Sequence, residues 1–327
     1  MFRIQKPKDR DFIILNLTDI HADNCDWSPD HKHNAPLVTT IRQTIERVKP
    51  DLITLSGDYA WAGQNESYVH LGKLIEEYNT PWTLVWGNHD QERGYELLDG
   101  VVESLQQFEH LIYENGPKEL GRGNFVIAIC EGEKIIEGLI MMDTHNRVKF
   151  INKDGNEDWG WGKVFPNQIE WYRENVCKLT DLGCKETMVI THQPIYAYKL
   201  AIKNALKDGI DIKSISVADA LKGEHFKDGY DTSFGINYED VCCFKEDEGF
   251  FDVIKELGST KNCLCGHDHV NFSSIVYEGV RLTFGLKAGR GAYWRPDLSG
   301  GTAITVSSEG VTNIRHEFVD VAHLVKD

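Results

Sequence analysis

Apolar residues along this chain follow two alternating patterns. Short β-branched and aromatic runs such as Phe12–Ile20 are typical of buried strands, whereas Ala35–Lys49 is apolar at every third or fourth position and predicts a helix. Strands and helices alternate over most of the chain, and the region after Ser274 predicts mostly strands. This order favours two packed mixed sheets flanked by helices over one doubly wound sheet. We therefore expect an α/β fold.

The same two patterns predict the remaining elements. Further strands are expected at Leu52–Leu55, Trp82–Trp86, Phe125–Cys130, Ile135–Met142, Thr187–Thr191, Asn262–Cys265, Ser274–Tyr277, Val280–Phe284, Ala303–Val306 and Asn313–Val319. Further helices are expected at Glu66–Tyr78, Tyr95–Phe108, Ile169–Leu182 and Phe250–Leu257. The sequence contains no Pro-, Ser- or Gly-rich linker and no internal repeat. A long polar stretch at about 196–248 is expected to form a cap or lid insertion.

Five of the predicted strands run into turns that carry metal-ligating side chains. The loops beyond the carboxyl ends of strands form the site in α/β proteins, so these turns are expected to meet. Residues two apart in an extended chain point to one face, as Asp19 does with His21. The five turns are Asp19-Ile20-His21, Gly57-Asp58, Gly87-Asn88-His89-Asp90, His192-Gln193-Pro194 and Gly266-His267-Asp268-His269. Together they predict one shared site.

The donor set predicts two divalent metal ions rather than one. Seven side chains exceed the four ligands of a tetrahedral site, but they suit two ions that share a carboxylate. Nitrogen and oxygen donors without a thiolate favour Mn, Fe or Zn. The expected ligands are Asp19, His21, Asp58, Asn88, His192, His267 and His269.

The net charge of the chain restricts the classes of partner that it is expected to bind. The 327 residues include 51 acidic and 35 basic side chains, which gives a formal net charge of −16. A protein this acidic repels phosphate backbones, so we expect no nucleic-acid partner, and a nuclease is disfavoured. Two divalent ions balanced by two carboxylates would still leave positive charge at the predicted site, where a small anion could bind.

Neither a membrane nor an oxidising compartment is indicated. No apolar run approaches the length of a membrane helix, so no membrane partner is expected. The first residues lack the apolar core of a signal peptide, which favours a cytoplasmic protein. The 8 cysteines are then expected to be reduced thiols, with Cys263 and Cys265 as buried strand residues.

The five motifs together resemble the motif set of the calcineurin-like metallophosphoesterases. They extend from Asp19 to His269 and have to converge, so we expect one domain over residues 1–327. The resemblance implies a four-layer α-β-β-α sandwich, in which two mixed sheets are flanked by helices. It also implies a dinuclear metal centre that hydrolyses phosphoesters.

The resemblance further implies a role for each ligand. Asp58 would bridge the two ions, and His89 would face the substrate phosphate and the leaving group without binding metal. His89 is the best candidate for the proton donor, and Asp90 is its expected orienting partner. One ion would be held by Asp19, His21, Asp58 and His269, and the other by Asp58, Asn88, His192 and His267.

Differences between this sequence and individual branches of the superfamily narrow the set of subfamilies that it resembles. Trp61 and Ala62 stand where the protein Ser/Thr phosphatases of this superfamily have Asp and Arg. His21 stands where purple acid phosphatases have Gly, and no Tyr is placed as a ferric ligand. The segments 87–92, 266–271 and 285–293 look more like the small purple-acid-phosphatase-like proteins and the fungal phosphatases related to them. Class III cyclic-nucleotide phosphodiesterases share all five motifs and stay open.

The leading interpretation is a phosphomonoesterase that acts on a small-molecule phosphoester, with a metal-bridging hydroxide attacking phosphorus. A cyclic-nucleotide or other phosphodiesterase is the alternative within enzymes. A non-catalytic scaffold with the same fold is the alternative of another class, but a scaffold should have lost ligands and none of the seven is missing. The oligomeric state stays open.

Three segments outside the motifs allow either a functional or a structural role. Trp159 and Trp161 suit a pocket wall or lid as well as ordinary packing. Residues 143–146 follow a strand and could reach the site. Arg290, Tyr293 and Arg295 could contact the metal ligands or the leaving group.

Overall fold

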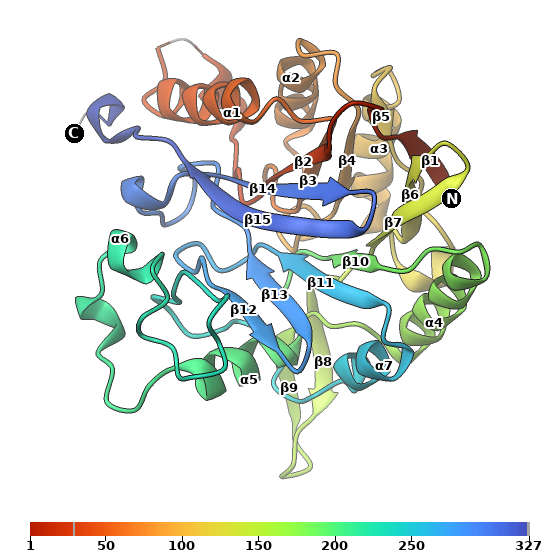
Figure 1. The fold of residues 1–327 in the computed structure, drawn as a ribbon. Helices are drawn as coiled ribbons and strands as arrows, with labels where there is room; N and C mark the ends of the chain where they lie inside the picture. The colour runs from red at the N-terminus through yellow and green to blue at the C-terminus, as the bar shows by residue number, and fades with distance from the viewer. Residues whose placement is uncertain (29, 326–327) are drawn as a thin grey trace.

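Two large mixed β-sheets form the centre of the computed structural model, which describes residues 1–28 and 30–325 (Figure 1). The seven-stranded sheet has the order β1 (Phe2–Gln5), β6 (Phe125–Glu131), β7 (Lys134–Met141), β10 (Thr187–Ile190), β11 (Thr260–Cys265), β13 (Val280–Phe284), β12 (Ser274–Tyr277). The six-stranded sheet has the order β15 (Gly310–Phe318), β14 (Gly300–Ser307), β2 (Phe12–Leu17), β3 (Leu52–Ser56), β4 (Trp82–Val85), β5 (Leu111–Ile112). A separate hairpin joins β8 (Arg147–Ile151) to β9 (Glu157–Trp161).

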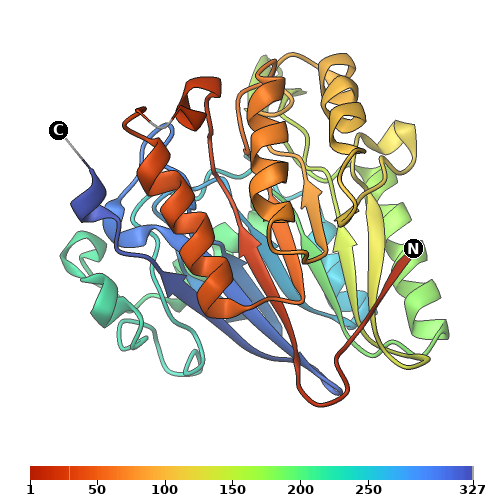
Figure 2. The same cartoon turned by 90° about the horizontal axis from the view of Figure 1, so that it is seen from above.

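Helices cover the outer faces of the two sheets. On the six-stranded sheet these are α1 (Asn34–Val48), α2 (Asn65–Glu76) and α3 (Tyr95–Leu105), drawn in red to yellow in Figure 2. On the seven-stranded sheet they are α4 (Pro166–Asp181), α5 (Tyr196–Ala205) and α7 (Phe250–Leu257). The short helix α6 (Val217–Ala220) lies in the loops after α5, and five single turns of 3₁₀ helix, η1 to η5, complete the set in the described residues. In residues 1–28 and 30–325, no helix is long and apolar enough to cross a membrane.

Three apolar cores hold these layers together. The core between the sheets includes Phe12, Val85, Met188 and Ile304, each almost fully buried. The other two cores lie between each sheet and its helices. This arrangement confirms the predicted four-layer α-β-β-α order, because burying both faces of each sheet requires a partner layer on each side.

The elements that the sequence did not predict are short or polar. Strand β1 and hairpin β8–β9 alternate exposed and half-buried residues, and β5 has only two residues, so none of them forms an apolar run. Helix α5 lies inside the segment expected to form a cap. Its residues Ala197, Tyr198, Ala201 and Ala205 are buried in the core beneath the seven-stranded sheet. The cap at about 196–248 and the single domain over 1–327 stay predictions.

Parallel pairing brings the predicted motifs to one edge. Strands β2, β3 and β4 are parallel neighbours in one sheet, and β10, β11 and β13 are parallel neighbours in the other. The two sheets meet at this edge, where the backbone of His267 after β11 donates to Oδ2 of Asp19 after β2. Thr18, after β2, bridges to Lys287 of the segment after β13. The site is therefore built from both sheets.

One buried carboxyl group lies outside this site. Glu137 of β7 is fully buried, and neither of its carboxylate oxygens has a hydrogen-bond partner among the described residues. It lies two residues before Leu139 of the core between the sheets, so its side chain points to the same face of β7. Burial, with a contribution from Glu186, raises the pKa of Glu137 well above its ordinary value near 4.5. The folded protein therefore keeps Glu137 protonated and neutral.

This difference predicts a pH dependence of stability. Above the ordinary pKa the unfolded chain releases the Glu137 proton and the folded chain keeps it, so the free energy of unfolding falls as pH rises. Replacing Glu137→Gln removes that fall, which is at most about 1.4 kcal/mol per pH unit for one proton. Urea unfolding at a series of pH values should show a smaller slope above pH 4.5 in the variant than in the wild type. Glu133→Gln, in the exposed turn before β7, is the matched control and should keep the wild-type slope.

Candidate metal centre

The ligand-bearing turns begin with strained backbone. Asp19, His21, Asp58 and His267 all have positive φ, between 48° and 76°, which is uncommon for residues other than glycine. Hydrogen bonds from the backbone of Asp19 to Gly57 and of His21 to Asp58, 3.1 and 2.9 Å long, hold the first two turns side by side. Strained backbone of this kind persists only where the surrounding structure determines it, and it gathers at functional sites.

Two glycines leave the space that the ligands occupy. A Cβ at Gly57, whose φ is +92°, would lie 2.3 Å from the imidazole Nδ1 of His192. A Cβ at Gly87 would lie 2.1 Å from the carboxylate Oδ1 of Asp58. Any larger residue at either position would therefore displace a predicted ligand, which explains why a glycine precedes these turns.

The first group of predicted ligands is assembled around His21. Its Nε2 lies 2.9 Å from Nε2 of His269, 3.6 Å from Oδ2 of Asp58 and 3.7 Å from Oδ1 of Asp19. His269 Nε2 is also 3.4 Å from the same oxygen of Asp19. All four side chains are buried, and their ligand atoms lie close enough to share one ion.

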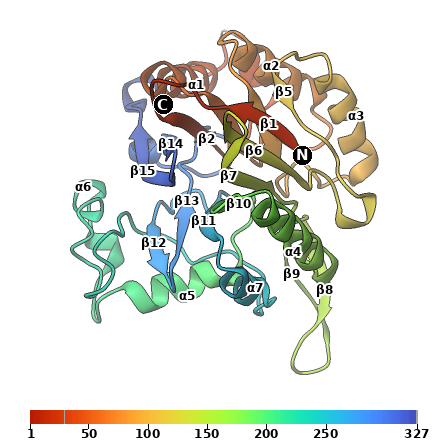
Figure 3. The same cartoon turned by 45° about the vertical axis from the view of Figure 1, so that its right-hand side comes forward.

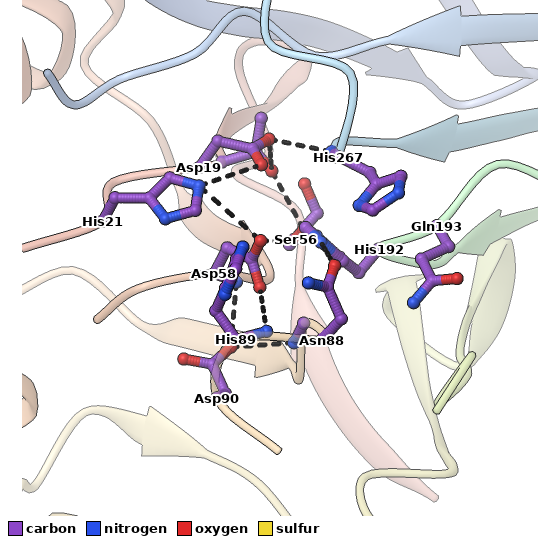
Figure 4. Close-up of polar contacts among 12 residues, drawn as sticks. Asp19, His21, Ser56, Asp58, Asn88, His89, Asp90, His192, Gln193 and His267 are labelled. Carbon is purple, nitrogen blue, oxygen red and sulfur yellow. Dashed lines mark hydrogen bonds and ion pairs between the residues drawn. The ribbon is translucent and has the colours of Figure 1, made fainter. Parts of the chain in front are cut away.

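The second group shares Asp58 with the first. His192 Nε2 lies 3.1 Å from Asp58 Oδ2 and 3.1 Å from the side-chain oxygen of Asn88. His267 completes a second set of buried donors with Asp58 and His192. Figure 4 shows these side chains pointing toward one another from both sheets. The structure thus brings all seven predicted ligands into two adjacent groups with one carboxylate in common.

Hydrogen bonds fix which nitrogen of two histidines faces the ligand groups. His192 Nδ1 lies 2.8 Å from the carbonyl oxygen of Ser56, and His269 Nδ1 lies 2.8 Å from that of Tyr293. A carbonyl can only accept, so Nδ1 donates in both, and in the neutral ring Nε2 carries a lone pair. A lone pair aimed at carboxylate oxygen is repulsive unless a cation lies between them. Histidines that bind metals are typically oriented by such a carbonyl contact.

Buried polar atoms without hydrogen bonds also indicate a cation at this site. Asp19 Oδ1, Asp58 Oδ2 and His267 Nε2 are buried and have no well-aligned hydrogen bond among the described residues. Buried polar atoms are nearly always paired in folded proteins, so three such atoms in the ligand groups call for a further group. Carboxylate and imidazole donors fit divalent cations such as Mn, Fe or Zn.

The protonation of the histidines supports the same fit. Burial lowers the pKa of His21 and of His267 to about 3, so both rings are neutral and able to bind a cation. Burial alone would lower the pKa of His192, but Asp58 and Asp19 raise it to about 9. Burial would likewise raise the pKa of Asp58, but His192 and His21 hold it below its usual range. A cation bound between His192 and Asp58 would take the place of the proton that His192 holds there.

The carboxylate of Asp90 accepts hydrogen bonds from backbone amides and not from the ring of His89. Its Oδ2 accepts hydrogen bonds of 2.8 Å from the backbone of Gly87 and of Asp58, and its Oδ1 accepts one from the hydroxyl of Tyr68. Burial and the neighbouring charge of Asp58 raise the pKa of Asp90 to about 7. Asp90 thus fastens the turn after β3 to the turn after β4. Its catalytic role stays a prediction.

His89 has a partner that the sequence did not reveal. Its Nδ1 lies 2.5 Å from the carboxylate of Glu92, three residues along the chain, and not against Asp90 as expected. The ring of His89 is partly exposed and lies 5.1 Å from the ring of His21, outside both ligand groups. The sequence Asn88-His89-Asp90-Gln91-Glu92 held both carboxylates, and spacing alone could not choose between them.

Aromatic rings surround the ligands. Trp61 packs 4.5 Å from His89, Trp161 packs 4.5 Å from His267, and Tyr293 stacks 4.3 Å from His269. Of these, Trp161 and Tyr293 were singled out in the sequence without a fixed role. Tyr59, beside Asp58, instead donates its hydroxyl to the carbonyls of Leu55 and Val85. Its hydroxyl is therefore committed to backbone and not to the ligand groups.

The segment after β13 packs against the turn that carries Asp19. Lys287 is buried, and its Nζ donates to the backbone carbonyl of Asp19 at 2.7 Å. Burial lowers the pKa of Lys287 to about 7. Sequence analysis missed Lys287, although a lysine inside the apolar, glycine-rich run Gly285–Gly291 was a signal that could have identified it.

Comparisons with known proteins agree with this site. The family model for calcineurin-like phosphoesterases matches residues 12–271. A protein of Arabidopsis thaliana named probable inactive purple acid phosphatase 14 is 25% identical over 322 residues, which cover 87% of this chain and 72% of that protein. Phosphatase DCR2 of Saccharomyces cerevisiae is 25% identical over 300 residues, 82% of this chain and 46% of that protein.

A solved structure has the same fold. The dimetal phosphatase from Danio rerio superposes with a TM-score of 0.58 and 11% identity, covering 94% of this chain and 99% of that one. The expected resemblance to purple-acid-phosphatase-like and fungal proteins is confirmed by the two relatives. Since the family model covers most of the chain, including all five ligand-bearing turns, the chain belongs to the calcineurin-like phosphoesterase family.

Proposed function

We propose that this chain is a two-metal phosphoester hydrolase and that it acts as a phosphomonoesterase on a small molecule. The observation that carries the proposal is the position of Asp58 Oδ2, a buried oxygen that lies 3.6 Å from Nε2 of His21 in one ligand group and 3.1 Å from Nε2 of His192 in the other. A shared carboxylate with ligands on both sides is the arrangement that holds two ions close together.

The proposed ions are Mn, Fe or Zn, because the donors are nitrogen and oxygen without a thiolate. When bound, such ions supply positive charge for a phosphate and a water that is nucleophilic at neutral pH. The residues proposed to hold one ion are Asp19, His21, Asp58 and His269, and those proposed to hold the other are Asp58, Asn88, His192 and His267.

His89 is the proposed proton donor to the leaving oxygen. It lies beside the ligand groups without joining them, and the contact of Nδ1 with Glu92 orients the ring. Trp61 packs against the rings of both His89 and His21, at 4.5 and 5.1 Å between ring centres, and limits the movement of His89. His89 can therefore hold a proton close to the position where a leaving group would depart.

A scaffold without activity is the alternative of another class. The word "inactive" in the name of the plant relative raises it directly. A chain that had lost the chemistry would be expected to lose ligands, yet this chain keeps all seven, and it also keeps His89 with its carboxylate partner. The intact set favours a working enzyme.

Substrate hydrolysis distinguishes these functions. The purified chain, loaded with Mn, Fe or Zn, is assayed with p-nitrophenyl phosphate and with bis(p-nitrophenyl) phosphate. We expect faster hydrolysis of the monoester. Faster hydrolysis of the diester would favour a phosphodiesterase, and cyclic nucleotides would then be assayed. Two bound ions without hydrolysis of either ester would identify a scaffold.

Removing the shared carboxylate should remove metal as well as activity. Asp58→Asn keeps the shape of the side chain but loses the charge that both ions would share, so we expect lower metal content and a large loss of rate. Elemental analysis of the purified variant measures this directly. Asp51→Asn is the matched control, since Asp51 precedes the same strand at its opposite end and pairs with Arg10. Two ions retained with full activity in Asp58→Asn would contradict the bridging role.

Removing His89 should affect the rate and not the metal. We expect His89→Ala to retain both ions and to lose about 10²- to 10⁴-fold in rate with an alkyl phosphate, because general acid catalysis is typically of this size. The loss should be smaller for p-nitrophenyl phosphate, whose leaving group departs as a stable anion. An equal loss for both esters would indicate phosphate binding, and a lost ion would make His89 a ligand.

The control for this variant is another histidine paired with a glutamate. His110 Nδ1 lies 2.8 Å from Glu76 and is about as exposed as His89, but it precedes β5, far along the chain from the five motifs. His110→Ala should keep the wild-type rates with both esters.

A further inference from the structure

A second pocket lies beside the metal centre, at the base of hairpin β8–β9. It has a volume of about 310 Å³, within the range of small-ligand sites. Figure 3 shows the hairpin extending beyond the body of the molecule from this region. The lining residues that matter here are Gln91, Tyr95, His145, Asn146, Arg147 and Phe165.

Direct contacts connect this pocket to the predicted ligands. Gln91 follows Asp90 in the turn after β4. On the opposite wall, the side-chain nitrogen of Gln193, next to His192, donates to the carbonyls of His145 and Asn146 at 3.0 Å each. The walls of the pocket are therefore continuous along the chain with the turns that carry Asp90 and His192.

The guanidinium of Arg147 places a positive charge between the pocket and the predicted ligands. Arg147 and Trp161 are opposite one another across the β8–β9 hairpin, and the guanidinium carbon of Arg147 lies 4.5 Å from the Trp161 ring centre. The other neighbour of that ring is His267, also 4.5 Å away between ring centres. The guanidinium is thus separated from a predicted ligand by a single indole.

The charge of Arg147 is not neutralised by the protein. In the described part of the chain no carboxylate pairs with Arg147, whereas Arg10, Arg122 and Arg173 each bind one. The pocket lining contains no acidic residue, although the whole chain has 51. An unpaired guanidinium in such an acidic protein, held over the face of an indole, is ready to bind an anion.

The side chains of Gln91, Tyr95 and His145 already make hydrogen bonds within the protein. Tyr95 donates within reach of both His145 Nδ1, at 2.8 Å, and Asp143, at 3.2 Å. Gln91 donates to the other oxygen of Asp143 at 2.8 Å. These contacts keep the walls in place, so Arg147 is the charged group that is free to recognise a ligand.

We propose that this pocket is a subsite for a second phosphate group and that the substrates of the enzyme are small organic bisphosphates. One phosphate would lie at the metal centre and the other on the guanidinium of Arg147, which can bind it through two parallel hydrogen bonds. The inference rests on the proposed function for the first phosphate, and it adds the recognition of the second.

The test uses alkanediol bisphosphates of increasing chain length, each compared with the ω-hydroxyalkyl monophosphate of the same length. The measured quantity is the ratio of kcat/KM for the two esters, corrected for the two equivalent ends of the bisphosphate. In the wild type we expect a ratio of about 10 to 100 at the length that spans the two sites, the range of a hydrogen-bonded charged group. Arg147→Gln should bring that ratio close to one.

Lys149→Gln is the matched control. Lys149 lies two residues along the same strand, over Trp159, and it does not line the pocket. Its removal changes the net charge by the same amount and should leave the ratio at the wild-type value. A ratio near one at every length in the wild type, or a ratio that survives Arg147→Gln, would overturn the proposal. An equal fall in Lys149→Gln would also overturn it, since long-range charge alone would then explain the preference.

Binding separates this proposal from the proposed function. If the wild type hydrolysed no monoester, the proposed function would fail, and the subsite would be tested by calorimetry with non-hydrolysable alkane bisphosphonates and monophosphonates on the Mn-loaded protein. Tighter binding of the bisphosphonate that Arg147→Gln abolishes would support the subsite. Equal binding of the two compounds by the wild type would overturn it.

Discussion

The architecture depends on one carboxylate that has to serve two sets of histidines. Asp58 lies in a turn with positive φ, is almost fully buried, and places its Oδ2 3.1 Å from Nε2 of His192 and 3.6 Å from Nε2 of His21. Such a group is unfavourable in a protein interior unless cations compensate it. Much of the surrounding structure keeps it in place. Gly57 and Gly87 make room for it and its neighbour, Asp90 binds its backbone, and both sheets supply the donors that face it. The fold therefore forces the carboxylate and the histidines close together at this site.

Rigidity comes from contacts that do not themselves reach the ligand positions. Ser56 and Tyr293 each accept a hydrogen bond from a histidine ring and thereby decide which nitrogen faces inward. Lys287 fixes the carbonyl of Asp19, and Gln193 fixes the start of the β8–β9 hairpin. Contacts of this kind keep ligands in a binding geometry before any ion arrives, which reduces the reorganisation that binding would require.

The sequence predicted two sheets flanked by helices and the set of seven ligands because both follow from local rules. The division of those ligands into two groups was implied by the family resemblance. Each ligand stands directly after an apolar strand, and parallel strands bring such positions together without any knowledge of distant contacts. The partners of those ligands could not be predicted in the same way. Lys287 reaches Asp19 across 268 positions, and Glu92 rather than Asp90 meets His89 because Asp90 is occupied by backbone groups. Hairpin β8–β9 was missed because its strands alternate exposed with half-buried residues and contain no continuous apolar run.

The position of β14 has a consequence for how the molecule is made. This late strand lies between β15 and β2 and completes the sheet that carries Asp19 and Asp58, while Tyr293 and Lys287 also come from the last part of the chain. During synthesis the amino-terminal strands emerge long before the strand that covers their edge, and pairings this distant in sequence form slowly. The ligand-bearing turns therefore reach their final arrangement only after β14 and the segment that carries Lys287 and Tyr293 have been synthesised.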